Sequence, residues 1–271
     1  MGALVALTGA SGEVASLIRP ALSNIYALRS SDVRAPAPLF ENERYVRANL
    51  RSLSAMRRAL RGAQAAIHLG GVSKEASFEN ILEANIRGVY NLFEAARLEG
   101  IRRVVFASTG HVTGFYARSA IIDESATVRP DTLYAASKVF GEAVGRLYAD
   151  KYGMEVVCIR IGHVSVQPMY DVDRHIWISP RDLAQLLEIA LERTPLHFEV
   201  LYGVSDNRLR WWSLDRAREL GYRPKDAATE RVTLKRPGPP TVGELVQGES
   251  FAARGFAGDM SRLWRPAQSS P

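Results

Sequence analysis

A tyrosine and a lysine four residues apart are the most chemically suggestive pair in this 271-residue chain. They lie in the stretch TLYAASKVF, residues 132–140, as Tyr134 and Lys138. The stretch has the pattern of a helix, in which residues four apart share one face. An ammonium group beside a phenol favours the phenolate and lowers the pKa of the phenol. The spacing therefore predicts that Tyr134 is a general base tuned by Lys138. The alternative is a surface pair beside an apolar stripe of small side chains.

A glycine-containing turn, LTGASGEVAS (residues 7–16), stands between an apolar run and a helical pattern. Gly9 and Gly12 allow a tight turn, in which a pyrophosphate can approach the backbone N–H groups of a helix N-terminus. Ala15, at the third small position, lets the helix pack against the strand. An ordinary strand–helix turn is the alternative, but the order strand–turn–helix at the start of the chain predicts dinucleotide binding.

An acidic residue follows this turn at a spacing that suits binding of the adenosine ribose. Asp32 lies 20 residues after Gly12, just past the predicted second strand. A carboxylate there accepts hydrogen bonds from the adenosine ribose and repels a 2′-phosphate, which favours NAD. Arg29 and Arg34 are close by and could hold NADP instead, and a plain turn aspartate is the third interpretation.

Two further predicted strands end in small or polar residues. HLGGVS offers Gly70 and Gly71, where backbone can approach a cofactor. The run VVFASTGH brings polar side chains to the carboxyl edge of the sheet, where ligands of such sheets bind. A hydroxyl there can hold a substrate oxygen while Tyr134 takes its proton. For Ser108 burial against the sheet is an equal alternative, and His111 is either a substrate contact or a loop histidine.

Short apolar runs alternate with helical patterns along the chain. Strands are expected at 3–9, 24–28, 44–48, 65–71, 102–109, 155–162 and 197–204, and helices at 13–23, 52–61, 77–99, 134–152 and 179–193. Residues 169–179 are expected to form a loop and the tail beyond 235 to be irregular. This alternation predicts an α/β fold, a Rossmann-type doubly wound parallel sheet with a small C-terminal substrate-binding appendage. We expect a core over residues 1–162 and a substrate-binding region over 163–271, interleaved with it.

The composition of the chain limits the kinds of partner and the cellular location that we expect. The net charge of +6 comes from scattered arginines without a nucleic-acid-binding signature, so nucleic acid is not expected, whereas an anionic small molecule is. No apolar run is long enough for a membrane helix, and the N-terminus lacks the features of a signal peptide. The single cysteine, Cys158, lies in an apolar run and excludes an internal disulfide. A cytoplasmic protein with a buried thiol is the simplest expectation.

These motifs together resemble the extended short-chain dehydrogenase/reductase superfamily, and more specifically the uronate dehydrogenases. The similarity is carried by HLGGVSKEASFENILEANIRGVYNLFEAAR (68–97), VVFASTGHVTGFY (104–116) and RPDTLYAASKVFGE (129–142). The resemblance implies an NAD-dependent oxidation of the anomeric carbon of a hexuronic acid to an aldarolactone. It also implies that helices 77–99 and 134–152 form a homo-oligomer interface.

The resemblance assigns roles to individual residues. Tyr134 is the base, Lys138 tunes it and holds the nicotinamide ribose, and Thr109 takes the place of the catalytic serine. Arg174 is the candidate for binding the uronate carboxylate. The remaining cofactor-binding candidates are Gly9, Ser11, Gly12, Glu13, Val14, Asp32, Asn49, Leu50, Leu69, Gly70, Gly71, Asn85 and Ile161, and the remaining substrate-binding candidates are Ser73, Gly110, His111, His163 and Phe251. No metal site is expected.

Two positions depart from the pattern of the uronate dehydrogenases. Gly110 replaces an asparagine that touches substrate, and His163 replaces a serine after the sixth strand. Both departures put the identity of the sugar in doubt more than the dehydrogenase class. A sugar or sugar-nucleotide epimerase, dehydratase or other dehydrogenase is the alternative enzyme, although about 110 residues after position 160 are few for a nucleotide-binding lobe. A non-catalytic NAD sensor is the third alternative.

Overall fold

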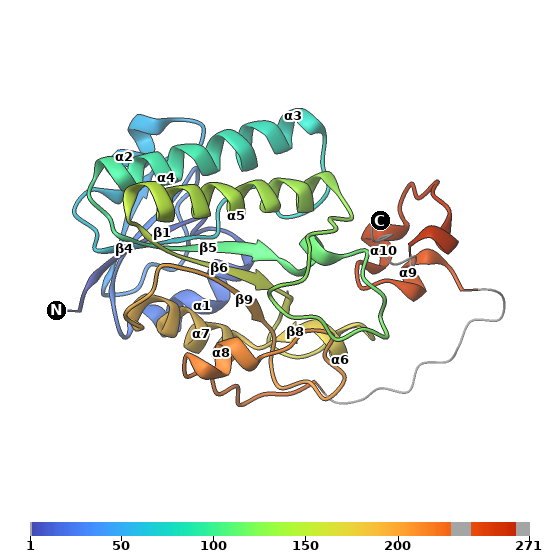
Figure 1. Ribbon diagram of the computed structural model, residues 1–271. Coiled ribbons are helices and arrows are strands. Elements are labelled where there is room, and N and C mark those ends of the chain that lie inside the picture. The colour runs from blue at the N-terminus through green and yellow to red at the C-terminus, as the bar shows by residue number, and fades with distance from the viewer. Residues whose placement is uncertain (1, 229–239, 264–271) are drawn as a thin grey trace.

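A seven-stranded parallel sheet forms the centre of the molecule in the computed structural model, which describes residues 2–228 and 240–263 (Figure 1). The strand order is β3-β2-β1-β4-β5-β6-β9. The bounds are β1 Leu4–Thr8, β2 Ala27–Asp32, β3 Glu43–Arg47, β4 Ala65–His68, β5 Arg103–Thr109, β6 Glu155–Ile161 and β9 Phe198–Gly203. Because the order reverses between β1 and β4, a crevice opens between the turns that follow these two strands.

Helices cover both faces of the sheet (Figure 1). One face carries α2 (Leu53–Leu60), α4 (Gly88–Leu98) and α5 (Leu133–Tyr152), and the other carries α1 (Glu13–Ser23), α7 (Pro180–Glu192) and α8 (Asp215–Glu219). Each face has its own apolar core, and Cys158 is fully buried in one of them. The predicted doubly wound α/β fold is therefore confirmed. Strand β9, from the region after residue 162, extends the same sheet.

Interactions at its two ends define α5, the helix that carries Tyr134. The Thr132 hydroxyl accepts a hydrogen bond from Ala135 N (3.0 Å) and caps α5. The Glu75 carboxylate accepts another from Tyr134 N (2.9 Å), so the first turn is tied to the loop after β4. Gly153, in the left-handed conformation, ends the helix. Tyr134 thus lies in a first turn of α5 that is held by two side-chain hydrogen bonds.

The predicted second strand was misplaced. Residues 24–28 have the apolar pattern, but β2 begins at Ala27, and Ile25 is exposed. The interior of β2 is polar: the Ser30 hydroxyl donates to Glu43, a carboxylate that pairs with Arg19 at 2.6 Å inside the protein. Buried polar side chains with internal partners break the apolar pattern on which the prediction depended.

Residues 169–179, expected to be a loop, contain regular structure. Helix α6 (Asp173–Ile176) is followed by β8 (Trp177–Ile178), which pairs with β7 (His163–Val164). The fully buried Asp173 carboxylate accepts hydrogen bonds from Met169 N (2.6 Å) and Tyr170 N (2.8 Å). A buried carboxylate therefore stabilises this segment. No apolar pattern in the sequence predicts its helix and strand.

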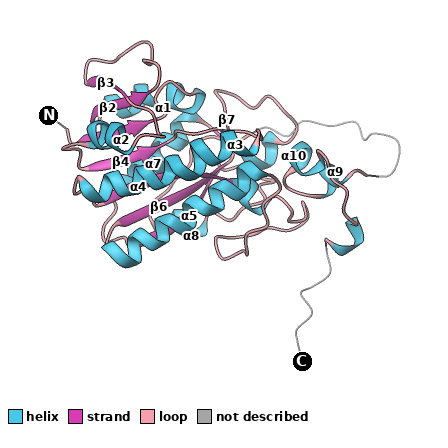
Figure 2. Ribbon diagram, turned by 90° about the horizontal axis from the view of Figure 1, so that it is seen from above, coloured by secondary structure: helices cyan, strands magenta, loops and turns pink. Residues whose placement is uncertain are grey.

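The C-terminal tail is also more ordered than expected. It forms α9 (Val242–Leu245) and α10 (Glu249–Ala253), at the end of the molecule opposite the N-terminus (Figure 2). The Arg118 guanidinium donates to Gly243 O (2.7 Å) and Val246 O (3.1 Å). Arg118, from the segment between β5 and α5, therefore holds both ends of α9. The last predicted irregular stretch, QSSP, lies outside the described residues.

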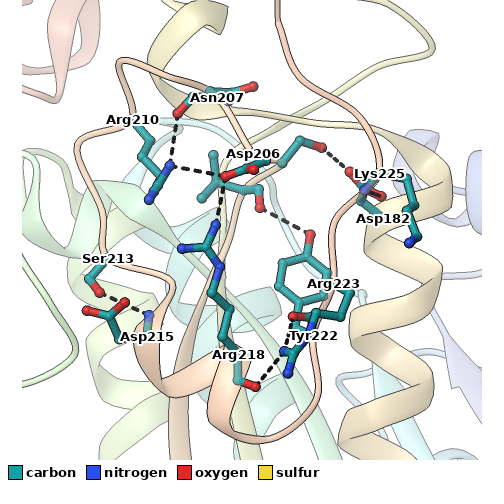
Figure 3. A network of polar contacts seen from close by, with 12 residues as sticks. Asp182, Asp206, Asn207, Arg210, Ser213, Asp215, Arg218, Tyr222, Arg223 and Lys225 are labelled. Atoms are coloured by element: carbon teal, nitrogen blue, oxygen red, sulfur yellow. Dashed lines mark hydrogen bonds and ion pairs between the residues drawn. The ribbon is translucent and has the colours of Figure 1, made fainter.

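A polar network fixes the segment between β9 and α8 (Figure 3). The buried Asp182 carboxylate accepts hydrogen bonds from Ser205 Oγ (2.7 Å) and Lys225 N (2.8 Å). The Asp206 carboxylate accepts hydrogen bonds from the guanidinium groups of Arg218 (2.8 Å) and Arg210 (3.2 Å). The network holds the loop that leads from β9 towards Trp212, a residue of the cavity described below.

Candidate active site

A cavity of about 670 Å³ lies at the carboxyl ends of the central strands. Its volume is typical of a small-molecule site. Nine cofactor-binding candidates line it: Gly9, Gly12, Glu13, Val14, Leu69, Gly71, Tyr134, Lys138 and Ile161. Seven substrate-binding candidates line it as well: Ser73, Thr109, Gly110, His111, Tyr134, His163 and Phe251. The fold thus brings most of the predicted set to one place.

Two backbone turns meet at the crevice between β1 and β4. Gly9 has φ +75°, and a Cβ on it would lie 2.5 Å from Gly70 N. Only glycine fits such a contact. Gly12 stands at the N-terminus of α1, where free backbone N–H groups can receive a pyrophosphate.

The Asp32 carboxylate lies beside this turn. Its Oδ2 accepts a hydrogen bond from Ser11 N (3.1 Å) and its Oδ1 one from Val33 N (2.6 Å). The negative charge is therefore fixed at the place where an adenosine ribose would reach the end of β2, and the site fits NAD. Neither Asp32 nor Ser11 lines the cavity itself.

Asn85 acts on the protein's own backbone. It lies in a π-helical turn, Leu82–Arg87, a feature that often marks functional sites. Its side chain accepts from Val72 N (2.7 Å) and donates to Val72 O (2.9 Å) and Ser137 Oγ (2.9 Å). Asn85 thereby positions the Gly71 loop against α5. Of the other cofactor candidates, Asn49 is exposed and Leu50 half-buried, and neither lines the cavity.

Tyr134, Thr109 and Lys138 are all buried against the cavity. The Thr109 hydroxyl lies close enough to the Tyr134 phenol to lower the Tyr134 pKa. The Lys138 ammonium donates to Ala107 O (2.8 Å) and lies 5.9 Å from the centre of the Tyr134 ring. The three side chains form one constellation, as the spacing predicts.

The pKa values differ from the sequence-based expectation. Burial raises the pKa of Tyr134 to about 12, against a smaller lowering by the Thr109 hydrogen bond. Burial also lowers the pKa of Lys138 to about 8, because a buried ammonium loses its hydration. The expected lowering of the Tyr134 pKa by Lys138 is therefore wrong, since burial raises this pKa.

Ser108 and Thr109 face different partners. The Ser108 hydroxyl donates to Glu142 Oε1 (2.6 Å), a buried carboxylate that also pairs with Arg160 (2.9 Å). Successive residues of a strand point to opposite faces, so Thr109 alone meets Tyr134. Ser108 is thus buried with an internal partner, although it also lines the cavity, and both of its alternatives stay predictions.

Two histidines line the cavity with a buried aspartate behind each. His111 Nδ1 is 2.7 Å from Asp131 Oδ2, and His163 Nδ1 is 2.6 Å from Asp173 Oδ1. Both aspartate side chains are fully buried. Each carboxylate orients its imidazole, so the imidazoles form a polar wall that can hydrogen-bond a polyhydroxy ligand.

The C-terminal segment closes the cavity. Phe251 packs on His111 with ring centres 4.3 Å apart. Glu249, a non-glycine residue with φ +50°, lines the cavity and forms an ion pair with Arg118. Burial raises the pKa of the Glu249 carboxyl. Arg118, which holds α9, is therefore also tied to a side chain of α10 that lines the cavity.

Arg174 lies at the edge of the site. It does not line the cavity, although its neighbours Asp171 and Val172 do. Its guanidinium pairs with Asp171 Oδ2 (3.0 Å) and is half-buried. Its role towards a substrate stays a prediction.

Sequence reasoning missed several lining residues. Trp212 occupies the space that a side chain at position 110 would need, and Gly110 leaves that space open to it. No motif surrounds Trp212, so only the folded chain could reveal it. Of residues 246–251 (VQGESF), the resemblance singled out Phe251 alone. The missed lining residues include Tyr170, Asp171, Trp212, Gln247, Gly248, Glu249 and Ser250.

The fold and the site define a class: an NAD-dependent oxidoreductase of the Rossmann type, with a buried tyrosine and lysine at the carboxyl edge of its sheet. The model of the NAD dependent epimerase/dehydratase family matches residues 5–193, and the chain belongs to this family.

Known relatives resemble the chain over nearly its whole length. Uronate dehydrogenase of Pseudomonas syringae pv. tomato is 40% identical over 260 residues, covering 93% of this chain and 94% of the relative. NAD-dependent glucose-6-phosphate dehydrogenase of Haloferax volcanii is 34% identical, covering 83% and 94%. Among solved structures, a tyrosine-to-alanine variant of uronate dehydrogenase from Agrobacterium tumefaciens, complexed with NAD, has a TM-score of 0.86 at 35% identity and covers 93% and 97%. The resemblance, the oxidoreductase class and the cofactor predicted from the sequence are confirmed.

Other expectations stay predictions. Among residues 2–228 and 240–263 no helix is long and apolar enough to cross a membrane. The cytoplasmic location, the homo-oligomer, the division at residue 162 and the absence of a nucleic-acid partner are likewise predictions.

Proposed function

We propose that the protein oxidises the anomeric C1 hydroxyl of a hexuronic acid, glucuronate or galacturonate, to an aldarolactone with NAD. The observation that carries the proposal is that Tyr134 and Thr109 line, with Lys138, the same cavity as the Gly9–Gly12 turn. The likeness to the Pseudomonas uronate dehydrogenase over 93% of the chain supports the same substrate class.

The chain supplies a place for the cofactor. Gly9 and Gly12 would receive the pyrophosphate, Asp32 the adenosine ribose and Lys138 the nicotinamide ribose. When bound, NAD accepts the hydride that leaves C1 of the sugar.

The protein's own residues handle the proton. Thr109 would donate a hydrogen bond to the C1 oxygen, and Tyr134, as phenolate, would accept the proton as the C1–H bond breaks. Because burial raises the pKa of Tyr134 to about 12, little phenolate is present near neutrality. We therefore expect the rate to rise with pH through the alkaline range, and a charged Lys138 to assist only below its pKa of about 8.

The carboxylate of the sugar needs a cation. Arg174 is the candidate, and binding would require its guanidinium to exchange Asp171 for the substrate or to share the two. Arg174→Ala should raise KM for an acidic sugar far more than for its neutral parent. An equal effect on both sugars would remove Arg174 from this role.

Replacement of the proposed base tests the reaction. Tyr134→Phe should lower turnover by about 10²–10⁴-fold, the usual contribution of a positioned acid or base, while NAD affinity changes little. Tyr90→Phe, on the exposed face of α4, is the matched control and should behave as the wild type. Full activity of the Tyr134 variant would refute the proposed role.

Oxidation of another sugar at C1 is the second candidate. The relative named as a glucose-6-phosphate dehydrogenase, at 34% identity, and the glycine at position 110 both favour a test with a wide sugar panel. An epimerase would retain its NAD and produce no net NADH, so the same assay separates the two classes.

A further inference from the structure

The indole of Trp212 takes the space beside Gly110. A Cβ placed on Gly110 would lie 2.2 Å from Trp212 Cη2 and 2.3 Å from Cζ2. A Cβ on Gly162, at the end of β6, would lie 3.2 Å from Trp212 Cζ3. The benzo edge of Trp212 therefore fills the volume that any side chain at position 110 would need.

The indole is held in this place from two sides. It stacks on Tyr202 with ring centres 5.0 Å apart and planes 15° from parallel. Its Nε1 donates to Gln247 Oε1 (3.0 Å), and the Gln247 amide donates in turn to Ala117 O (3.0 Å). Trp212 is only 3% exposed. Rotation away from Gly110 would break the stack and the hydrogen bond together.

The side of Trp212 that meets the cavity is apolar. Its only polar atom is already paired with Gln247, so ring carbons alone are left for a ligand. Gly110 adds no donor on this side. The oriented imidazoles of His111 and His163 supply hydrogen bonds elsewhere in the cavity.

We propose that Trp212 is a specificity-determining residue, an apolar wall on the sugar side of the cavity. The inference rests on the proposed function for the substrate class. A pyranose fits when it presents C–H groups to the indole and its hydroxyls to the two histidines. A hydroxyl turned towards Trp212 would lose its water without gaining a partner, and that loss discriminates between epimers.

A double-mutant cycle between positions 110 and 212 tests the contact. Gly110→Ala should lower kcat/KM for the preferred sugar by at least about tenfold, because the added methyl collides with a fixed indole. In a Trp212→Leu background the same Gly110→Ala change should cost less than about twofold, since the space is then open. Affinity for NAD should stay within about twofold in all variants, which separates this wall from the cofactor side.

The epimer ratio tests specificity. Glucuronate and galacturonate differ only at C4, and Trp212→Leu should reduce the wild-type ratio of their kcat/KM values severalfold. Trp211→Leu is the control: Trp211 is equally buried, stacks on His175 and does not line the cavity, so this variant should keep the wild-type ratio. An unchanged ratio in Trp212→Leu, or one changed equally in Trp211→Leu, would overturn the proposal.

Two outcomes separate this inference from the proposed function. An equal cost of Gly110→Ala in both backgrounds overturns the inference even if uronates are oxidised. If the wild type oxidises neither uronate but another sugar, the proposed substrate fails, and the cycle and the epimer comparison are run on that sugar. If no sugar is oxidised, the cycle is read from thermal unfolding midpoints with NAD bound, where coupling supports the contact and additivity overturns it.

Discussion

The cofactor side and the sugar side of the cavity are built in different ways. On the cofactor side, two backbone turns meet at Gly9 and Gly70, and the chemistry lies in N–H groups at the end of one helix. On the sugar side, lining residues converge from segments as distant as 109–111, 163–172, 212 and 247–251. The first construction depends on a few consecutive residues, and the second on how remote segments are held together.

The difference explains what the sequence could reveal. A tight turn needs glycine at fixed positions, so the sequence alone predicts the role of Gly9 and Gly12. The buried supports of the sugar side, Asp131 and Asp173, have no spacing rule that connects them to His111 and His163. Trp212 reaches the cavity through a loop fixed by polar contacts, and no pattern predicts its destination.

The fold shows the same contrast. Apolar runs correctly marked β1, β4, β5 and β6, which are buried on both faces. They failed at β2, where Ser30 is buried with Glu43 of β3 as its partner, and at α6, which depends on one carboxylate. The direction of the Tyr134 pKa shift was not predicted because its main cause is burial, which the spacing of two residues does not reveal.

The largest expected effect breaks the cofactor side. Gly9→Ala places a methyl 2.5 Å from Gly70 N at φ +75°, and we expect NAD affinity to fall by more than about 100-fold or the turn to unfold. Gly62→Ala is the matched control, since Gly62 has φ +71° and nothing within 4 Å. Calorimetric titration with NAD measures both. Equal losses in the two variants would mean that backbone strain, and not the close approach, is what matters.

A smaller effect should be confined to the sugar side. Arg118→Ala removes the side chain that holds both ends of α9 and pairs with Glu249. We expect KM for the sugar to rise about tenfold, because Phe251 and Glu249 lose their support, whereas NAD affinity stays the same. Arg146→Ala, in an exposed ion pair of α5, is the control. A parallel loss of NAD affinity in Arg118→Ala would contradict the division into two sides.

The smallest effect concerns Lys138, which stands between the two sides. Its pKa is lowered to about 8, below the ordinary 10.5, so the unfolded chain binds more protons between these values and stability contributed by Lys138 rises with pH across that window. Lys138→Met should therefore lose activity yet raise the free energy of unfolding at pH 7 by about 1–3 kcal/mol. The gain should shrink as the pH rises towards 10. Denaturant unfolding at several pH values checks this, with the exposed Lys151→Met as control.

The central claim is that a buried tyrosine removes a proton from a sugar acid while NAD is reduced. The most direct test mixes the protein with NAD and glucuronate or galacturonate, follows NADH and identifies the product. The account predicts NADH in equal amount to the aldarolactone, with formation faster at alkaline pH and lost in Tyr134→Phe but not in Tyr90→Phe. Binding of NAD without NADH formation from either sugar, or equal rates in the two tyrosine variants, would contradict it.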